Sequence, residues 1–484
     1  MKEAIRIQSI LDTVYLCLNI IGGIILIPYY LKFISINLYG FWLATSGIIV
    51  LFDALDFGIS SIFTERISKL YSTEKFKTLT DYFISGLFLF ITLSLLILFV
   101  GLIFSLFLDT FFDLDSLKEV IVNCFKISLL TSCLKLINVG FINFGSSLLK
   151  PLYFSLTKII SLIISIIFAV KLLNLDFGLY SLAIGYLVQQ IIGFFFFLFI
   201  SIRLIKKLNP TPKWAIKFDV LKDYLFSMKY LFFARSAESA IKNIEPVIIA
   251  STLGPNFTAI YVFGKKISDL IYQFVNIFSG ASFSSLINIQ QKIKSGDKDV
   301  RINNINKFIF YLSIILLGFY ISINNNFLHI WVGEEFKISS NLVPLFGLAS
   351  LLMIWIQFRT VFHFSKNIFK HVSKVLFFEA IARIGLLFLL INNFGMFGGP
   401  IAIILSSSIA ILLLEKKISI DYNSAAIFIY IFSTSTILGK INFVDIPIYN
   451  ILIKCTIVFI LLSLMLVNRK FRENITRLKE YILH

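Results

Sequence analysis

The sequence predicts an all-α, polytopic membrane protein. Hydrophobic residues make up 58% of its 484 residues and charged residues only 15%, whereas soluble domains carry about 25% charged residues. The mean hydropathy is +0.90. Apolar stretches of about 20 residues, long enough to cross a bilayer core of ~30 Å, follow one another along almost the whole chain. No segment is left over for a soluble domain.

Hydropathy places about fourteen membrane helices in order along the chain, beginning with a first span too long for the core of a cleaved signal peptide. The expected ranges are 10–33, 38–64, 81–108, 120–142, 154–173, 178–204, 227–252, 257–287, 306–330, 341–362, 372–392, 397–414, 424–440 and 450–467.

The loops between these helices alternate in charge. Most of the 44 Lys and Arg fall in the termini and in every second loop, notably 65–80, 203–229, 288–305 and 363–374. The intervening loops carry Asp and Glu instead. By the positive-inside rule the basic loops and both termini are cytoplasmic. The net charge of +17 therefore reflects membrane topology, and we expect no nucleic-acid partner.

A weak internal repeat divides the chain. Residues 37–42 after the first helix align with residues 256–261 after the seventh, with Trp42 over Tyr261. This alignment superposes two six-helix halves. We expect an N-terminal bundle over 1–210, a C-terminal bundle over 211–416, and two extra helices with a basic cytoplasmic tail over 417–484.

The helix over 227–252 carries four charges at membrane depth. Arg235, Glu238, Lys242 and Glu245 follow steps of 3, 4 and 3 residues, which at 100° per residue places them within a stripe about 80° wide. If all four faced lipid, the cost would be about 10 kcal/mol. Two alternatives remain: a salt-bridge ladder between neighbouring helices, or one wall of a water-filled central cavity.

Other charged residues within apolar segments are also expected to face away from lipid. The further candidates for binding a substrate in the cavity are Lys135, Lys266 and Arg383. Lys265 with Asp269, and Glu379 with Arg383, are spaced as i,i+4 pairs and could instead be local ion pairs. Charges of both signs in both halves suit a path for a bulky polar substrate.

The sequence also lacks several kinds of catalytic motif. The four His and four Cys show no metal-ligand spacing, and neither a phosphate-binding glycine loop nor a nucleophile elbow is present. We expect no cofactor, no metal and no enzymatic activity. ATP-driven pumping by this chain alone is therefore not expected.

Three short stretches resemble a known family. They are LYGFW at 38–42 followed by LFDALDFGISS at 51–61, IIASTLGP at 248–255, and WVGEEF at 331–336. They are similar to motifs of the Wzx-type polysaccharide flippases, which translocate O-antigen and capsule repeat units. That family belongs to the superfamily of multidrug, oligosaccharidyl-lipid and polysaccharide exporters. The resemblance implies two six-helix bundles around a central cavity, although these flippases commonly have twelve helices.

The resemblance also implies a substrate and a location. The substrate would be an oligosaccharide linked to undecaprenyl pyrophosphate, flipped by alternating access from the cytoplasmic to the outer leaflet of a bacterial inner membrane for O-antigen or capsule synthesis. Membrane lipid, a glycan polymerase and a chain-length protein would be its partners. Two other functions remain open: a cation-coupled multidrug exporter and an integral glycan polymerase or ligase.

Ion coupling needs a carboxylate inside the membrane. Asp53 and Asp56 would lie about 60° apart on one helix face, and Asp269 is a further candidate. Alternatively, Asp56 could cap a local break before Gly58, and Asp53 could pair with a lysine.

Overall fold

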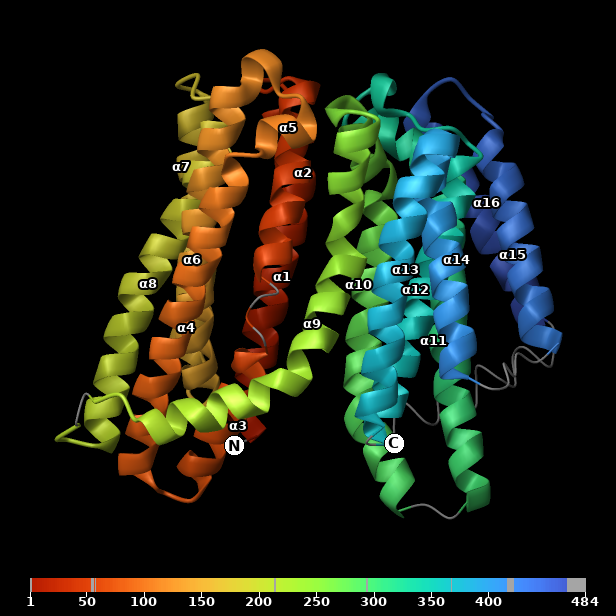
Figure 1. The fold of residues 1–484 in the computed structure, drawn as a ribbon. Helices are drawn as coiled ribbons and strands as arrows, with labels where there is room; N and C mark the ends of the chain where they lie inside the picture. Colours follow the sequence, from red (N-terminus) through yellow and green to blue (C-terminus); the bar gives the residue numbers. More distant parts are fainter. Residues whose placement is uncertain are drawn as a thin grey trace. The chain divides into compact units, whose positions relative to one another are not determined.

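The structure is a computed structural model that describes residues 2–53, 56, 58–212, 215–292, 295–366, 368–415 and 422–467. These residues form helices and no β-strand (Figure 1). The long helices are α1 (Lys2–Tyr30), α2 (Ile36–Asp53), α4 (Phe76–Ser105), α6 (Lys118–Ser147), α7 (Leu152–Leu173), α8 (Tyr180–Leu208), α9 (Phe218–Thr252), α10 (Pro255–Lys292), α11 (Ser295–Trp331), α12 (Leu342–Ser365), α13 (Phe369–Phe394), α14 (Gly398–Leu414), α15 (Tyr422–Lys440) and α16 (Pro447–Val467). Shorter helices are α3 (Ile59–Ser72) and α5 (Leu108–Phe112), with 3-10 turns at Asp115–Leu117, Glu334–Phe336 and Gly395–Phe397.

The long helices agree with the expected set of membrane spans. Among the described residues, eight segments are long and apolar enough to cross a membrane, and one of them, Lys370–Leu414, contains both α13 and α14. Shorter apolar helices cover Ile36–Phe52, Ser424–Lys440 and Pro447–Ile460. Charged residues inside α9 and α10 lower the hydropathy of these two long helices. The chain is a multi-pass, all-α membrane protein.

Several expected boundaries were wrong. The range 38–64 holds two helices, because α2 ends at Asp53 and α3 begins at Ile59. Gly58 between them has a left-handed φ of 78°, which glycine adopts without steric cost. The long connection expected over 203–229 is mostly helical, since α8 continues to Leu208 and α9 begins at Phe218.

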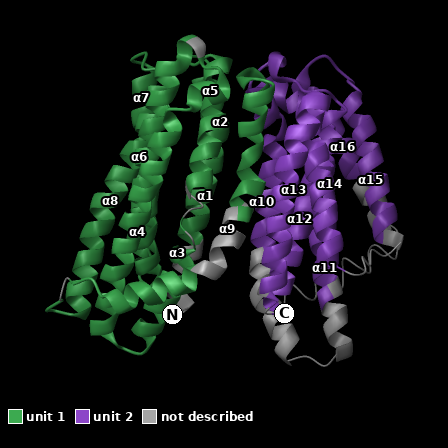
Figure 2. Ribbon diagram, viewed as in Figure 1, with its two compact units in different colours: residues 1–258 green, residues 259–484 purple. Residues whose placement is uncertain are grey.

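Two compact units make up the chain, residues 1–258 and 259–484 (Figure 2). The first contains α1 to α9 and the start of α10. The division after 210 and the separate tail from 417 stay predictions.

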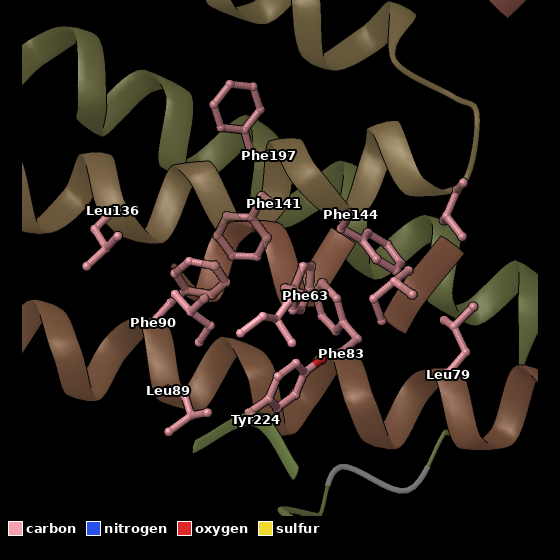
Figure 3. Packing of buried hydrophobic residues seen from close by; sticks show 14 of the residues in the cluster. Phe63, Leu79, Phe83, Leu89, Phe90, Leu136, Phe141, Phe144, Phe197 and Tyr224 are labelled. Atoms are coloured by element: carbon pink, nitrogen blue, oxygen red, sulfur yellow. The ribbon is translucent and has the colours of Figure 1, made fainter. Parts of the chain in front are cut away.

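An aromatic core holds unit 1 together (Figure 3). The rings of Phe83 and Phe144 lie 4.2 Å apart, and those of Phe63 and Phe90 lie 5.5 Å apart, edge to face. A Cβ added to Gly86 would come within 2.5 Å of the Phe63 ring. Glycine thus lets α4 approach this ring closely, as small residues do between membrane helices.

The first turns of α9 belong to this core. Tyr224 has no exposed surface, and its hydroxyl donates to the Tyr82 carbonyl at 3.2 Å. Arg66 of α3 pairs with Asp223 at 3.0 Å. These contacts hold the beginning of α9 against α3 and α4.

In unit 2, α15 and α16 pack along α11. The hydroxyls of Tyr311 and Ser424 lie 3.0 Å apart. Lys454 of α16 has no exposed surface, and its Nζ donates to Asn326 Oδ1 at 2.8 Å. The two helices outside the repeat therefore pack on α11 as part of this unit.

The short stretches singled out in the sequence mark close helix approaches. A Cβ on Gly40 in α2 would lie 1.9 Å from the carbonyl oxygen of Pro255, and a Cβ on Gly399 would lie 2.3 Å from the Tyr261 hydroxyl. Each contact lies within one unit. The LYGFW stretch at 38–42, which contains Gly40, therefore contributes to helix packing within unit 1.

Candidate functional site

Two of the four charged positions of α9 have described side chains. Glu245 is buried, with 1% exposure, and Lys242 is half-buried. The side chains of Arg235 and Glu238 lie outside those described. The proposed charged stripe is therefore not tested as a whole, and its role stays a prediction.

Polar side chains on α9 pack directly on α2. The Ser239 hydroxyl donates to the Val50 carbonyl at 3.1 Å, and the Asn243 amide donates to the Ser239 carbonyl at 3.0 Å. A Cβ on Gly47 would lie 3.0 Å from the Asn243 carbonyl oxygen. Part of the polarity of α9 thus serves helix packing inside unit 1.

The break between α2 and α3 involves one of the two coupling candidates. Asp56 Oδ1 accepts a hydrogen bond from the Gly58 N–H at 2.8 Å. The alternative that Asp56 caps a local break is confirmed. The side chain of Asp53 lies outside those described.

On α10, the expected i,i+4 pair is present. Lys265 Nζ lies 3.6 Å from Asp269 Oδ1, and the side chain of Asp269 keeps 39% exposure. Lys266 is half-buried. Both Tyr320 and Asn324 of α11 donate to the Gly264 carbonyl at 3.0 Å, one residue before the first lysine. This polar group joins α10 to α11.

Two enclosed charges lie in the seam of α12, α13 and α14. Arg383 Nη2 lies 2.6 Å from Glu379 Oε1 and 2.8 Å from Ser407 Oγ, and Arg383 Nε donates to Ser406 Oγ at 3.3 Å. Oε2 of the same glutamate has no hydrogen-bond partner among the described atoms. Because burying one unpaired charge is costly, each group gives the other the opposite partner that it needs inside the unit. The local ion pair weighed from the spacing is confirmed.

On α6, Lys135 is exposed. Of the candidates with described side chains, unit 1 holds Lys135, Lys242, Glu245 and Asp56, and unit 2 holds Lys266, Asp269 and Arg383. Their binding and coupling roles stay predictions.

The structure also reveals charged contacts that the sequence analysis missed. Lys158 of α7 pairs with Asp12 of α1 at 2.8 Å, and its Nζ lies 4.8 Å from the centre of the Tyr15 ring. Arg359 of α12 pairs with Glu415, the residue that directly follows α14. The members of each pair are far apart in sequence, so no i,i+3 or i,i+4 spacing predicts them. The sequence could have indicated such a pair only by a single charged residue inside an apolar run, which needs a partner from another helix.

The ends of the helices carry simpler ion pairs. Lys118 Nζ lies 2.8 Å from Asp109 Oδ2, and this hydrogen bond lowers the pKa of the Asp109 carboxyl below its ordinary value. A hydrogen bond from Lys337 likewise lowers the pKa of Glu334. In contrast, burial raises the pKa of Glu415.

Among the described residues, no group of three or more His, Cys, Asp or Glu side chains could hold a metal ion. The four cysteines are free thiols.

A family model described as "Polysaccharide biosynthesis protein" matches residues 56–341. This range covers more than half of the chain. A comparison with curated proteins finds no sequence that matches it.

Several solved structures share the fold. The lipid II flippase MurJ, in an inward closed conformation, matches with a TM-score of 0.73 at 16% identity, over 95% of this chain and 99% of that chain. An inward-facing multidrug resistance MATE family transporter of the MOP superfamily matches with a TM-score of 0.59 at 14% identity, over 90% of this chain and 99% of that chain. A MOP superfamily transporter from Pyrococcus furiosus gives 0.55 at 14%, over 90% of this chain and 95% of that chain. The chain therefore has the fold of flippases and transporters of this superfamily.

Proposed function

We propose that this chain, which belongs to the polysaccharide biosynthesis protein family, is a flippase for lipid-linked oligosaccharides. It moves repeat units attached to undecaprenyl pyrophosphate from the cytoplasmic to the outer leaflet of a bacterial inner membrane, with both termini cytoplasmic. The product supplies O-antigen or capsule synthesis, where a glycan polymerase and a chain-length protein act next. The family match over 56–341 is the observation that carries the proposal.

The chemistry of such a substrate fits a membrane protein of this composition. A glycan and a pyrophosphate are too polar to cross hydrocarbon, whereas the prenyl tail is soluble in it. The protein therefore needs to enclose only the head group. Charged side chains occur within membrane helices of both units, as Lys242 and Lys266 illustrate. Multidrug exporters share the fold, so the substrate must be tested directly.

Cationic side chains are the groups that would recognise the pyrophosphate. Charge-assisted hydrogen bonds from Arg and Lys to phosphate oxygens are short and strong. We assign this contact to Arg235 and Lys242, supported by Lys135 and Lys266. Arg383, predicted from the sequence as a further contact, is instead enclosed in its ion pair with Glu379. Glu238 and Glu245 would keep the empty path near neutral.

The energy source would be an ion gradient, the membrane potential or consumption of the product, since the sequence has no phosphate-binding glycine loop. Asp53, Asp56 and Asp269 are the coupling candidates. Asp56 already accepts a backbone hydrogen bond, so the substitutions Asp53→Asn and Asp269→Asn are the more informative tests. If either carboxylate couples flipping to an ion, its amide variant should flip independently of the proton or cation gradient.

Reconstitution tests the proposal. The purified full chain is placed in vesicles that contain a fluorescent undecaprenyl-pyrophosphate oligosaccharide, and an impermeant quencher reports the exposed fraction. We expect all label to become accessible in protein vesicles and about half in empty ones. Gradient-driven uptake of ethidium without lipid flipping would favour a multidrug exporter. Extension of the glycan by the protein alone would favour a polymerase.

A further inference from the structure

We infer that an aromatic and polar cluster inside unit 1 binds the sugar rings of the transported head group. The cluster comes from α1, α2 and α8 and consists of Tyr15, Tyr30, Tyr39, Trp42, Tyr186 and Gln189. We call it the sugar platform. The inference rests on the proposed function and adds to it the residues that contact the glycan.

Two parallel rings form the centre of the platform. The rings of Trp42 on α2 and Tyr186 on α8 lie 6.4 Å apart at an angle of 13°. The tyrosine is 51% exposed, whereas the tryptophan is half-buried. The tryptophan thus supports a tyrosine ring that remains accessible.

Two further tyrosines belong to the helices that form the platform. Tyr30 is the last residue of α1, and Tyr39 lies one turn before Trp42 on α2. Tyr39 is buried, with 5% exposure.

The platform continues into polar groups along α8. One turn after Tyr186, the Gln189 amide donates to the Tyr15 hydroxyl at 3.3 Å. Lys158 Nζ lies above the same Tyr15 ring and pairs with Asp12. The Gln189 amide and the Tyr15 hydroxyl thus lie one turn of α8 beyond Tyr186, and the Lys158 ammonium contacts the Tyr15 ring.

The faces of α8 argue against a lipid-facing role for Tyr186. At 100° per residue, Gln189 and Gln190 fall within about 60° of Tyr186, whereas Phe195 falls about 180° away. Phe195 is 63% exposed and is the kind of residue suited to lipid. Interfacial Tyr and Trp belts would explain a ring at the membrane surface. Gln189 and Gln190 on the same side of α8, however, hydrogen-bond Tyr15 of α1 and Asn138 of α6, so this side faces neighbouring helices rather than lipid. The tyrosine face is therefore the polar face of α8.

Sugar rings match this combination of groups. A pyranose ring has an apolar face of C–H groups, which packs on an aromatic ring, and a rim of hydroxyls, which need donors and acceptors. Binding sites of this kind combine aromatic walls with a few oriented polar groups. Neither a prenyl chain nor a pyrophosphate needs a stack of neutral aromatic rings.

Equilibrium binding to the full-length protein in nanodiscs tests the inference. The two probes are undecaprenyl pyrophosphate and the pool of lipid-linked oligosaccharide extracted from the cells that make the protein. We expect Trp42→Ala and Tyr186→Ala each to weaken binding of the glycan-bearing lipid about three- to tenfold. Binding of the bare lipid should be unchanged, which also reports that the variants are folded.

Matched substitutions separate stacking from packing. Trp42→Phe and Tyr186→Phe keep an aromatic ring and should retain most of the affinity. Phe199→Ala, on the same helix and 64% exposed, should bind both lipids as the wild type does.

The outcomes distinguish this inference from the proposed function. If the wild type binds neither lipid, the proposed function fails and the inference fails with it. If the wild type prefers the glycan-bearing lipid and the alanine variants keep that preference, the sugar platform alone is overturned. Equal loss of both lipids would also overturn it, because the residues would then act only through the fold.

Discussion

Arg383 and Glu379 form an ion pair enclosed inside unit 2, with Nη2 2.6 Å from Oε1 and side-chain exposures of 0% and 1%. They lie one turn apart on α13, and Ser406 and Ser407 of α14 complete the hydrogen bonds of the guanidinium. Two opposite charges thereby join two neighbouring helices.

The first prediction concerns this pair. Glu379→Ala leaves a buried guanidinium without its counter-charge and should lower the free energy of unfolding by about 3–5 kcal/mol. The double substitution Glu379→Leu with Arg383→Met should cost far less, because it removes both charges. Denaturant unfolding in detergent measures both values. Equal losses in the single and double variants would contradict a stability role for charge pairing.

The second prediction concerns Gly40. A Cβ there would lie 1.9 Å from the Pro255 carbonyl oxygen, so Gly40→Ala should force α2 away from the start of α10. We expect a loss of about 1–3 kcal/mol or more, as for overpacked cores. Gly23→Ala is the matched control, because nothing lies within 4 Å of its added Cβ. Similar melting temperatures for the two variants would refute the close contact.

The third prediction concerns Lys454 and Asn326. Asn326→Leu removes an acceptor from a buried ammonium group and should cost about 1.5–3 kcal/mol. Lys454→Met removes the charge itself while keeping an apolar stem, and its cost should be smaller. Melting temperatures of the two variants and of the double variant check this order. A larger loss for Lys454→Met would show that the lysine stabilises the contact of α16 with α11 by other means.

The fourth prediction concerns pH. The hydrogen bond from Lys118 lowers the pKa of Asp109 in the folded protein, so this pair stabilises the fold above the ordinary pKa of aspartate, about 4. The contribution is lost as pH falls through the lowered folded pKa. Lys118→Gln should therefore melt slightly below the wild type at pH 7 and converge with it in acid. Salt of about 1 M should shrink the difference at pH 7, because the pair is exposed. A constant difference across pH would exclude this ion pair as its cause.

The fifth prediction concerns transport. Arg235→Ala and Lys242→Ala should abolish surface polysaccharide in a cell that depends on this protein, without lowering its amount in the membrane. Immunoblotting of membranes and staining of surface glycan give the two readouts. Lys126→Ala is the control, because this lysine is exposed on α6 outside the proposed substrate contacts. Normal glycan export in both test variants would remove the two residues from the substrate path.

The sequence resolved the order of the long helices but not all of their ends. Hydropathy averages apolar residues over a window, so it could not separate α2 from α3, where a left-handed Gly58 interrupts a run that is apolar apart from Asp53 and Asp56. It also treated the beginning of α9 as loop. Those turns are helical because Tyr224 and Asp223 gain contacts with α3 and α4, and such contacts exist only in the folded unit.

By itself, the sequence determined the class of the protein and the helices that carry charge, because crossing a bilayer requires long apolar runs and makes each interruption conspicuous. It also gave the local pairs on α10 and α13, since helical spacing alone brings those side chains together. Only the tertiary structure decided which distant groups meet, such as Lys158 with Asp12, Lys454 with Asn326 and Trp42 with Tyr186. Their contacts depend on which helices pack side by side and on rotation about each helix axis, and neither is encoded in the spacing of residues along one helix.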